Sequence, residues 1–592
     1  MQCLAGKHQP LALYTHRVST NMKQSIVAAA LLLLSLHAHA AITGVVVDDV
    51  TNLPVADARV RVQTTTTTPV ITTADGEFSL TDVPAGSVVI TAVPGYDSSR
   101  TTNYITGSLT ATDGDMVVIR LTPLPRNDAS PYDPGSAEQC ATCHFDQFSE
   151  WQQSRHSGAA DNFWVRDLFS GDGSAGGGAG FVYTDTHDPG DSGFCATCHG
   201  PIEDAQDPGN VMFNDLQTAA GQDGVTCLAC HQMAEVNNNT DALHHLGNTQ
   251  YRFPDQGATE LWVWGPLDDI SNSAMRSSHQ PDFSDSRYCA SCHEYNNPET
   301  GAPGQSTYSD WLASPFAQPG PDFASCQDCH MPPADKPGPI STLGGQPIRP
   351  PEQRRAHDFI GTTPAELQAA IDLQLDATGS NGELLVDTEV SNNGSGHAFP
   401  TGVSIRNAIL HVQARVDGQP LPLIAGDVIP FYGSATGSNS TDDLAGEPGR
   451  GFARVLQGRI NGAGPVVRPV LFIDAESVWA DTRIASGASD ISTYRFDTSM
   501  LSPDSTIEVT AKLLYRRAWR DLAVTKGWSQ APDGDDVQTL VAEQTLDVLA
   551  AGTLPDIPAV PALGLRGMLL LILGLLLTLL LRPSRMIRNS QI

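Results

Sequence analysis

The stretch Cys227-Leu228-Ala229-Cys230-His231 holds a pattern, Cys-x-x-Cys-His, that occurs five times in this chain. Its spacing has a chemical reason: two thiols can each form a thioether with one vinyl group of a single porphyrin, and the adjacent imidazole then reaches the iron as its proximal ligand. Ten of the 11 cysteines belong to these motifs, and Cys3 alone lies outside them. The five copies occupy residues 140–144, 195–199, 227–231, 289–293 and 326–330.

Five covalently bound c-type haems are therefore expected. A lone Cys-x-x-Cys pair is also compatible with a structural zinc site, a redox-active dithiol or a surface disulfide. Those interpretations do not explain a histidine after every second cysteine in five copies. The predicted attachment sites are Cys140, Cys143, Cys195, Cys198, Cys227, Cys230, Cys289, Cys292, Cys326 and Cys329, and the predicted proximal iron ligands are His144, His199, His231, His293 and His330.

Both ends of the chain carry segments that indicate export. Residues 26–36 form an apolar run before Ala38-His39-Ala40, which fits a signal-peptidase site, so residues 1–40 are predicted to be removed. Residues 563–582 are mostly apolar, end at Arg582 and precede Arg585 and Arg588, which predicts a transmembrane helix or a sorting signal that is later cut. The positive-inside rule then places the rest on the periplasmic or cell-surface side of the membrane, anchored by this C-terminal helix.

Composition and charge fit an exported protein with several domains. A length of 592 residues suggests more than one domain, and 40% hydrophobic residues can build their cores. A formal net charge of −32 disfavours binding to nucleic acid and favours a basic redox partner protein or another cytochrome. The expected regions are a β-sandwich at 42–123, a mostly irregular and α-helical haem domain at 128–345, a linker at 346–379 and a second β-sandwich at 380–550.

Residues 42–123 show short alternating strands and contain no cysteine or histidine. Asp75-Gly76 marks a turn between two of these strands. The segments 44–48, 54–60, 73–80 and 83–86 resemble the carboxypeptidase regulatory-like family. That resemblance implies a transthyretin-like β-sandwich without catalytic residues, which we interpret as a spacer or docking module.

One internal repeat lies within the haem domain. Residues 148–156 read Phe-x-x-Trp-x-x-Ser-x-His, and residues 308–316 read Tyr-x-x-Trp-x-x-Ser-x-Phe. Aromatic residues three apart share one face of a helix, and we expect them to pack on a haem. Phe316 stands where the first copy has His156, so the second copy cannot supply an imidazole there.

The region at 380–550 returns to β-type alternation, as in 384–390, 405–415 and 506–515. Its opening loop, 392–402, reads Asn-Asn-Gly-Ser-Gly-His-Ala-Phe-Pro-Thr-Gly. The glycines and the proline hold His397 in a tight turn, and we expect this histidine to face a neighbouring haem.

The haem motifs, the aromatic repeat and the loop around His397 together resemble bacterial multihaem cytochromes c related to the tetrahaem cytochrome that accepts electrons from hydroxylamine oxidation. The resemblance covers about residues 135–415 and implies that most haems have two histidine ligands and form an electron wire. It implies His156, His279, His357 and His397 as distal ligands. This chain departs from that family in having five motifs and in having Phe316.

The supply of histidines can be counted without the resemblance. Outside the motifs, the haem-bearing and C-terminal regions contain eight histidines for five distal positions. We expect His245 to be the fifth distal ligand, with His244 as its alternative and His187 next, whereas His411 lies in a strand pattern and is expected to be structural. The eight are His156, His187, His244, His245, His279, His357, His397 and His411.

These features predict an exported, membrane-tethered multihaem cytochrome that relays electrons between redox partners and needs no catalytic residue. The alternative is an oxidoreductase of small nitrogen or sulfur compounds, which needs one iron with an open distal face and an acid–base group beside it. A cell-surface binding protein in which the haems have a structural role would explain the two sandwiches but not five haems. Phe316 keeps the enzyme alternative open.

Overall fold

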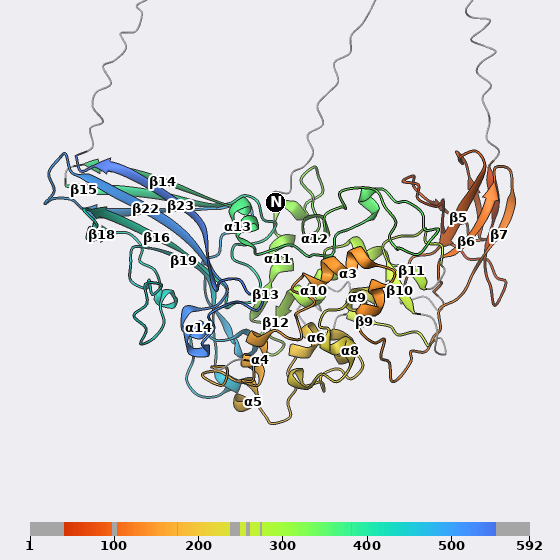
Figure 1. The fold of residues 1–592 in the computed structure, drawn as a ribbon, viewed down its shortest axis with the longest axis horizontal. Coiled ribbons are helices and arrows are strands. Elements are labelled where there is room, and N and C mark those ends of the chain that lie inside the picture. The colour runs from red at the N-terminus through yellow and green to blue at the C-terminus, as the bar shows by residue number, and fades with distance from the viewer. Residues whose placement is uncertain are drawn as a thin grey trace, which may run out of the picture.

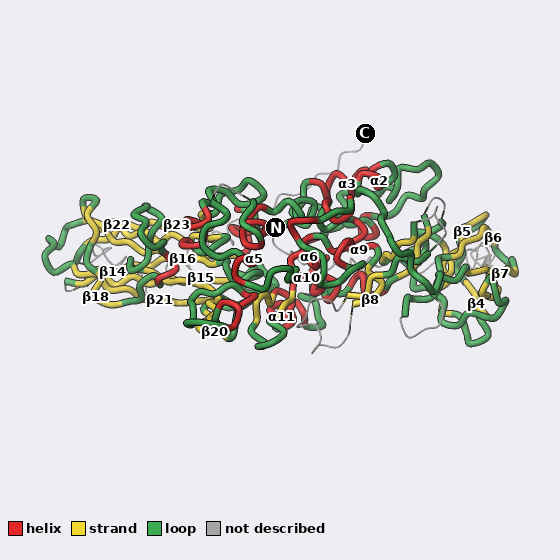
Figure 2. The backbone as a smooth tube through the Cα atoms, turned by 90° about the horizontal axis from the view of Figure 1, so that it is seen from below, coloured by secondary structure: helices red, strands yellow, loops and turns green. Residues whose placement is uncertain are grey.

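The computed structural model describes residues 41–97, 103–173, 176–236, 249–255, 261–272, 275–380 and 382–551. Three regions follow one another along an elongated molecule, with an N-terminal β-region at one end, the region of the haem motifs in the middle and a C-terminal β-region at the other end (Figure 1). The perpendicular view keeps this order (Figure 2). The predicted leader at 1–40 and the apolar segment at 563–582 lie outside the described residues.

Among the residues that the structure describes, no helix combines the length and the apolar character needed to cross a bilayer.

The N-terminal region consists of two small sheets that share one core. Their strand orders are β4-β1-β7 and β3-β2-β5-β6. Alternation along the strands buries Val46, Val60 and Ile90 between the sheets. Gly76 has a φ of +71°, and a Cβ there would lie 2.5 Å from the Val46 carbonyl oxygen, so the predicted turn requires glycine. The strands are β1 (Ile42–Asp48), β2 (Arg59–Val62), β3 (Val70–Ile71), β4 (Glu77–Leu80), β5 (Ser87–Val93), β6 (Gly107–Thr112) and β7 (Met116–Leu121).

The middle region is built from short helices, two-stranded ribbons and long connections, which agrees with the mostly irregular and α-helical domain expected there. Its helices are α2 (Glu138–Ala141), α3 (Phe145–Gln152), α4 (Phe163–Phe169), α5 (Tyr183–Thr186), α6 (Cys195–His199), α7 (Pro201–Asp204), α8 (Ala219–Gln222), α9 (Cys227–His231), α10 (Arg287–His293), α11 (Thr307–Leu312), α12 (Cys326–His330) and α13 (Pro364–Ala370). Its strands are β8 (Met233–Val236), β9 (Thr249–Tyr251), β10 (Trp262–Gly265), β11 (Arg276–His279), β12 (Glu294–Asn296) and β13 (Pro303–Ser306). Short 3-10 helices span Phe213–Asp215, Pro281–Ser284, Pro315–Ala317 and Pro351–Gln353.

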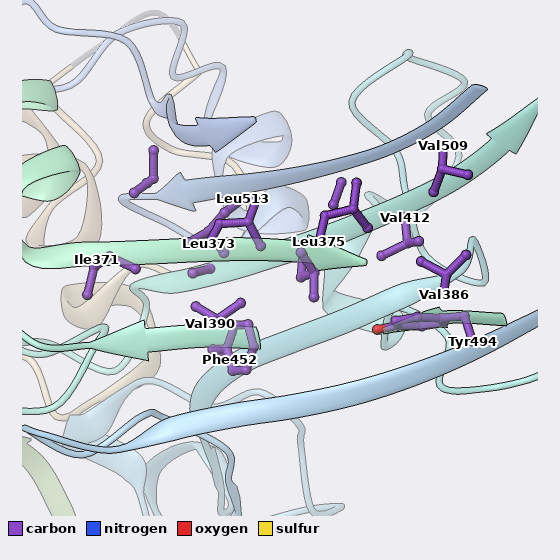
Figure 3. Close-up of a cluster of buried hydrophobic side chains, with 14 of the residues drawn as sticks. Ile371, Leu373, Leu375, Val386, Val390, Val412, Phe452, Tyr494, Val509 and Leu513 are labelled. Atoms are coloured by element: carbon purple, nitrogen blue, oxygen red, sulfur yellow. The ribbon is translucent and has the colours of Figure 1, made fainter. Parts of the chain in front are cut away.

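The C-terminal region has two larger sheets, with strand orders β14-β15-β21-β18 and β20-β19-β16-β22-β23. Leu373, Val386 and Tyr494 of the first sheet share a buried cluster with Val412 and Val509 of the second (Figure 3). The elements are β14 (Ile371–Ser380), β15 (Glu383–Asn392), β16 (Asn407–Val416), β17 (Gln419–Pro420), β18 (Leu423–Ala425), β19 (Gly449–Gln457), β20 (Ser477–Asp481), β21 (Ser489–Asp497), β22 (Thr506–Arg516), β23 (Gln538–Leu549) and α14 (Arg520–Lys526), with 3-10 helices at Phe431–Gly433, Ile460–Gly462 and Phe472–Asp474.

The segment expected as a linker, 346–379, is divided between the last two regions. Its final part forms most of β14, in which Ile371, Leu373 and Leu375 are buried and the residues between them are exposed. The C-terminal sandwich therefore begins at Ile371 and not at 380, because this alternation gives the strand an apolar face for the core. The earlier part of the segment carries His357 to the middle region, as described below.

A buried lysine joins the C-terminal and middle regions. Lys526, at the end of α14, is 0% exposed, and its Nζ donates to the carbonyl oxygens of Asp167 (2.8 Å) and Gly177. The Trp528 indole donates to the Asp167 carboxylate at 2.6 Å and stacks on Trp164 with ring centroids 4.4 Å apart. Donors and acceptors from both regions are thus paired inside one apolar cluster.

Replacing Lys526 by Met is expected to destabilise this joint. The two carbonyl oxygens would lose their buried lysine donor, which costs about 1–3 kcal/mol for each acceptor left unsatisfied. Urea unfolding should show the loss as a lower midpoint. Lys512→Met is the matched control, because Lys512 forms only a partly exposed ion pair with Glu543 at 3.1 Å, and such pairs are worth roughly 0–1 kcal/mol. Equal midpoints for the two variants would contradict the assigned role of Lys526.

Candidate haem-binding site

All five Cys-x-x-Cys-His motifs open on one continuous cavity in the middle region. Its volume is about 1520 Å³, and all ten motif cysteines and all five motif histidines line it. An ordinary ligand pocket holds roughly 300–1,000 Å³. Large apolar side chains such as Trp151, Phe194, Trp264, Tyr288 and Trp311 form much of the wall. A cavity of this kind suits several large, flat, apolar groups, because their burial would supply the core that the short helices cannot build alone.

The motifs contact one another in a definite order. The fourth motif contacts both the second and the fifth through thiol pairs, and the first contacts the third in the same way. In addition, Cys230 of the third motif interacts electrostatically with Cys292 of the fourth. The neighbouring thiol pairs are Cys140–Cys227, Cys198–Cys292 and Cys289–Cys326.

The internal repeat anchors two of the motifs in the same way. The Trp151 indole donates to the carbonyl oxygen of Val225 at 2.8 Å, and the Trp311 indole donates to that of Ala324 at 2.9 Å. Each acceptor lies two residues before a motif, and the hydroxyl of the residue in between caps the motif helix, α9 or α12. The helix after the first motif therefore positions the third, and the helix after the fourth positions the fifth.

A hydrogen bond at Nδ1 orients four of the five motif imidazoles. In each case a backbone carbonyl oxygen is the acceptor, which places the proton on Nδ1 and leaves Nε2 as the atom that can bind iron. The fifth, His293, has its Nδ1 3.4 Å from Nε2 of Gln305. The four pairs are His144–Ile340 (2.7 Å), His199–Ala159 (2.9 Å), His231–Trp264 (2.7 Å) and His330–Ile360 (2.5 Å).

Three motif histidines face a second imidazole across the cavity. Two metal–nitrogen bonds of about 2 Å would hold facing ring nitrogens about 4 Å apart and the ring centroids roughly 6 Å apart. The observed centroid separations are 6.4 Å for His156–His293, 6.5 Å for His231–His357 and 6.4 Å for His330–His397. Each pair therefore leaves the space that one iron with two histidine ligands requires.

Burial keeps these imidazoles in the form that binds metal. It lowers the pKa of His156, His357 and His397 to about 4 and that of His293 to about 3. A neutral imidazole offers a lone pair, whereas a protonated one does not. All four side chains are therefore available as ligands at neutral pH.

Contacts with two motif-bearing parts of the chain hold the His357 segment in place. The His357 backbone N–H donates to the carboxylate of Glu150 in α3 at 2.8 Å, and burial raises the pKa of Glu150. The neighbouring Arg355 donates to Asp328 in α12 at 2.9 Å. These bonds bring His357 opposite His231, although it is distant from His231 in sequence.

His397 enters the cavity from the C-terminal sandwich. Asn392, at the end of β15, and Ser395, in the loop itself, hold its backbone, since Asn392 Nδ2 and Ser395 Oγ each donate to the His397 carbonyl oxygen at 2.8 Å. Phe316, which lacks the imidazole of the first repeat, lies beside Gly396 in the same loop. The loop thus fills the position next to the second repeat and places its own histidine opposite His330.

The structure does not bring His279 to the cavity. His279 is buried in β11, is not among the lining residues, and has Asp268 and Arg59 as electrostatic neighbours. His245 and its alternative His244 lie outside the described residues.

His187 is held by other partners. Its Nε2 is 3.1 Å from Asp474 Oδ1, and its Nδ1 is 3.0 Å from Thr186 Oγ1. Within the described ranges, no second imidazole faces His144 or His199 at the spacing of the three pairs.

Two groups of site residues were missed from the sequence. The first is the set of carbonyl acceptors for Nδ1, which any residue type can provide and which therefore leave no sequence signal. The second is a set of arginines, whose guanidinium groups suit the two carboxylates of a porphyrin. No motif surrounds them, so only the fold identifies them. The lining arginines are Arg155, Arg354, Arg355, Arg406 and Arg517.

Two family models match separate parts of the chain. Residues 41–122 match the family model of the carboxypeptidase regulatory-like domain, and residues 139–232 match that of cytochrome c554 and c-prime. A penta-heme cytochrome c552 from Thermochromatium tepidum is a similar solved structure, with 21% identity, a TM-score of 0.47, and coverage of 70% of this chain and 98% of that chain. AvmM, which catalyses macrocyclization in alchivemycin A biosynthesis, shows 12% identity, a TM-score of 0.14, and coverage of 32% of this chain and 92% of that chain. The chain matches none of the curated proteins.

Proposed function

We propose that this chain, a cytochrome c with an N-terminal carboxypeptidase regulatory-like domain, carries five c-type haems and relays electrons between redox proteins outside the cytoplasm. The observation that carries the proposal is the set of three facing imidazole pairs in one cavity shared by all five motifs. When bound, haem iron supplies one-electron transfer. Two histidines on one iron leave no position for a substrate, so these three sites favour a carrier.

The chain's own residues would do three things in such a relay. The motif cysteines would fix each porphyrin edge, and the contacts between motifs would keep neighbouring groups close together. The carbonyl acceptors would hold each proximal imidazole in one orientation and raise its basicity as a ligand. The aromatic walls would exclude water and so limit the reorganisation that accompanies a change of charge.

The proposed partner is a basic redox protein or another cytochrome, met on the periplasmic or cell-surface side of a membrane to which residues 563–582 tether the chain. The net charge of −32 supports a basic partner, since opposite charge steers association. Electron transfer to a basic cytochrome should therefore slow as salt rises from low to physiological concentration. Stopped-flow mixing measures this rate, and a rate that is independent of salt would contradict electrostatic steering.

The haem count gives the direct test of the proposal. Protein matured in a host that attaches c-type haem should have an intact mass, after acid-acetone extraction, equal to the processed chain plus five haems. Thioether bonds survive this extraction, whereas noncovalent haem is lost. A mass with four or fewer haems would contradict the proposed relay.

A second candidate function is the reduction or oxidation of a small nitrogen or sulfur compound. One observation favours it: the side chains of Tyr183, His187 and Asp474 lie beside the second motif and include groups that can hold a proton. The histidine of that motif, His199, has no facing imidazole within the described ranges. Tyr183 and Cys195 belong to one cluster, and the Tyr183 ring stacks on His187 at 4.1 Å while His187 bonds to Asp474. Such a group could hold or deliver a proton next to an open iron position.

Carbon monoxide separates the two functions. We expect no stoichiometric carbon monoxide adduct and no sustained turnover of nitrite, hydroxylamine or tetrathionate if every iron has two histidine ligands. An adduct at one haem together with turnover well above that of free haem would favour the enzyme. If both are seen, Tyr183→Phe should reduce turnover and leave the adduct in place.

A further inference from the structure

The N-terminal domain is attached to the middle region through a loop that follows β10. Asp268 in this loop lies 2.7 Å from Arg59 Nε and 3.3 Å from Arg61 Nε, both in β2. The side chains of Asp268 and Arg61 are 7% and 13% exposed, so this contact is shielded from solvent, whereas Arg59 is 36% exposed. Removing one member of a shielded pair leaves an uncompensated charge, which strongly destabilises the contact.

Asp269, the next residue, connects three parts of the chain. Its carboxylate accepts a hydrogen bond from Thr64 N–H of the N-terminal domain at 2.7 Å and one from Arg349 Nη1 at 2.8 Å. Asp269 and Arg349 are each 1% exposed. Arg349 belongs to the segment that carries His357 to its position opposite His231. One buried carboxylate thus joins the N-terminal domain, the loop after β10 and the segment that carries His357.

The N-terminal domain also adds backbone contacts to β11, which pairs in parallel with β10. Thr106 N–H donates to the Ser277 carbonyl oxygen, and Tyr96 N–H donates to that of His279, both at 2.9 Å. These bonds extend the β10–β11 ribbon into the N-terminal domain. They also account for the position of His279, whose strand belongs to this contact.

Trp264 of β10 links this contact to the cavity. Its side chain is 1% exposed, packs edge-on against the Tyr96 ring with centroids 5.7 Å apart, and shares a cluster with Ile105 and Leu124 of the N-terminal region. Its carbonyl oxygen accepts the hydrogen bond from His231 Nδ1 at 2.7 Å. The ring contact and the carbonyl acceptor belong to one residue of β10, so a displacement of this strand that follows loss of the ring contact would also move the acceptor.

We propose that the N-terminal domain is a positioning element for the third haem site and not a spacer: it fixes Trp264, and through Trp264 the orientation and hydrogen bond of His231. The inference rests on the proposed attachment of haem at 227–231. Tyr96 is a positioning residue in this scheme. So are Asp268 and Asp269, together with the arginines that pair with them. Loss of the bond at Nδ1 makes the imidazole a weaker donor to iron, so the reduction potential of that haem should rise.

The test compares Tyr96→Ala with Tyr96→Phe in the full-length, haem-loaded protein. His357→Ala first identifies which low-spin EPR signal belongs to the third haem, because that signal should convert to high spin. Tyr96→Ala should then change this signal and raise the midpoint potential of the same haem, with the other signals unchanged. Tyr96→Phe keeps the ring against Trp264 and should retain the wild-type signal and potential.

A second variant guards against a folding defect in Tyr96→Ala. Arg59→Gln combined with Arg61→Gln removes the charges facing Asp268 without touching the cavity, and it should shift the same haem in the same direction. Wild-type signals and potentials in both Tyr96→Ala and the double variant would overturn the proposal. An intact mass that lacks the haem at 227–231 in the wild type would instead refute the proposed function, so the two failures are distinguishable.

Discussion

Replacing His397 by Ala should convert one iron from low spin to high spin while all five haems stay attached. His397 faces His330 with an interplanar angle of 8° and a centroid separation of 6.4 Å, and no other imidazole pairs with His330 in the described ranges. Alanine leaves that position without a nitrogen ligand. Low-temperature EPR of the oxidised protein should show one new high-spin signal and one fewer low-spin signal. The joint between the sandwich and the haem region should also loosen.

His411→Ala is the matched control for this experiment. His411 lies in β16 of the same sandwich, is 9% exposed and does not line the cavity. The same substitution there should change stability without changing any spin state. If His397→Ala and His411→Ala both give the wild-type EPR spectrum, His397 does not serve as a ligand and the sandwich is not part of the haem shell.

Removing the fourth attachment site should disrupt electron equilibration more than removing the first. The double variant Cys289→Ser with Cys292→Ser loses the motif that contacts the second, third and fifth motifs through its cysteines. The remaining sites would then fall into separate groups. After partial reduction, equilibration among the haems should slow by more than an order of magnitude, which stopped-flow absorption spectroscopy measures.

The corresponding variant at the first motif, Cys140→Ser with Cys143→Ser, is the control. Its thiol pair joins only the third motif, so the other four sites would stay connected. Both variants should lose the mass of one haem, which shows that the comparison is made at equal haem content. Equal equilibration rates in the two variants would contradict the central position of the fourth motif.

The sequence predicted the attachment chemistry because the Cys-x-x-Cys-His spacing is local. The same holds for the internal repeat, whose two tryptophans make equivalent bonds before two different motifs. The imidazoles that face the motif histidines are not close to the motifs in sequence. His156, His357 and His397 come from three different segments, and His279 matched the family pattern but lies in the contact with the N-terminal domain. Its electrostatic neighbours are Asp268, in the loop before its strand, and Arg59, which is far away in sequence.

Two other differences have similar causes. His187 was an alternative distal ligand, but Asp474, which comes from the C-terminal region, engages its Nε2. The alternation of Ile371, Leu373 and Leu375 was visible in the sequence, but only the pairing of β14 with β15 shows that this segment is a strand of the sandwich and not a linker. The membrane segment and His245 stay predictions, because they lie outside the described residues.

The delivery of His397 by the C-terminal sandwich has a consequence for how the protein matures. A chain made from its N-terminus presents all five attachment motifs before this histidine, and the loop around it is held by β15 and by Ser486 further along the chain. A product that stops before the sandwich would therefore carry its full complement of haem and still hold one iron with an exposed face. The haem content would not distinguish that product from the finished protein, whereas the spin state of the iron at His330 would.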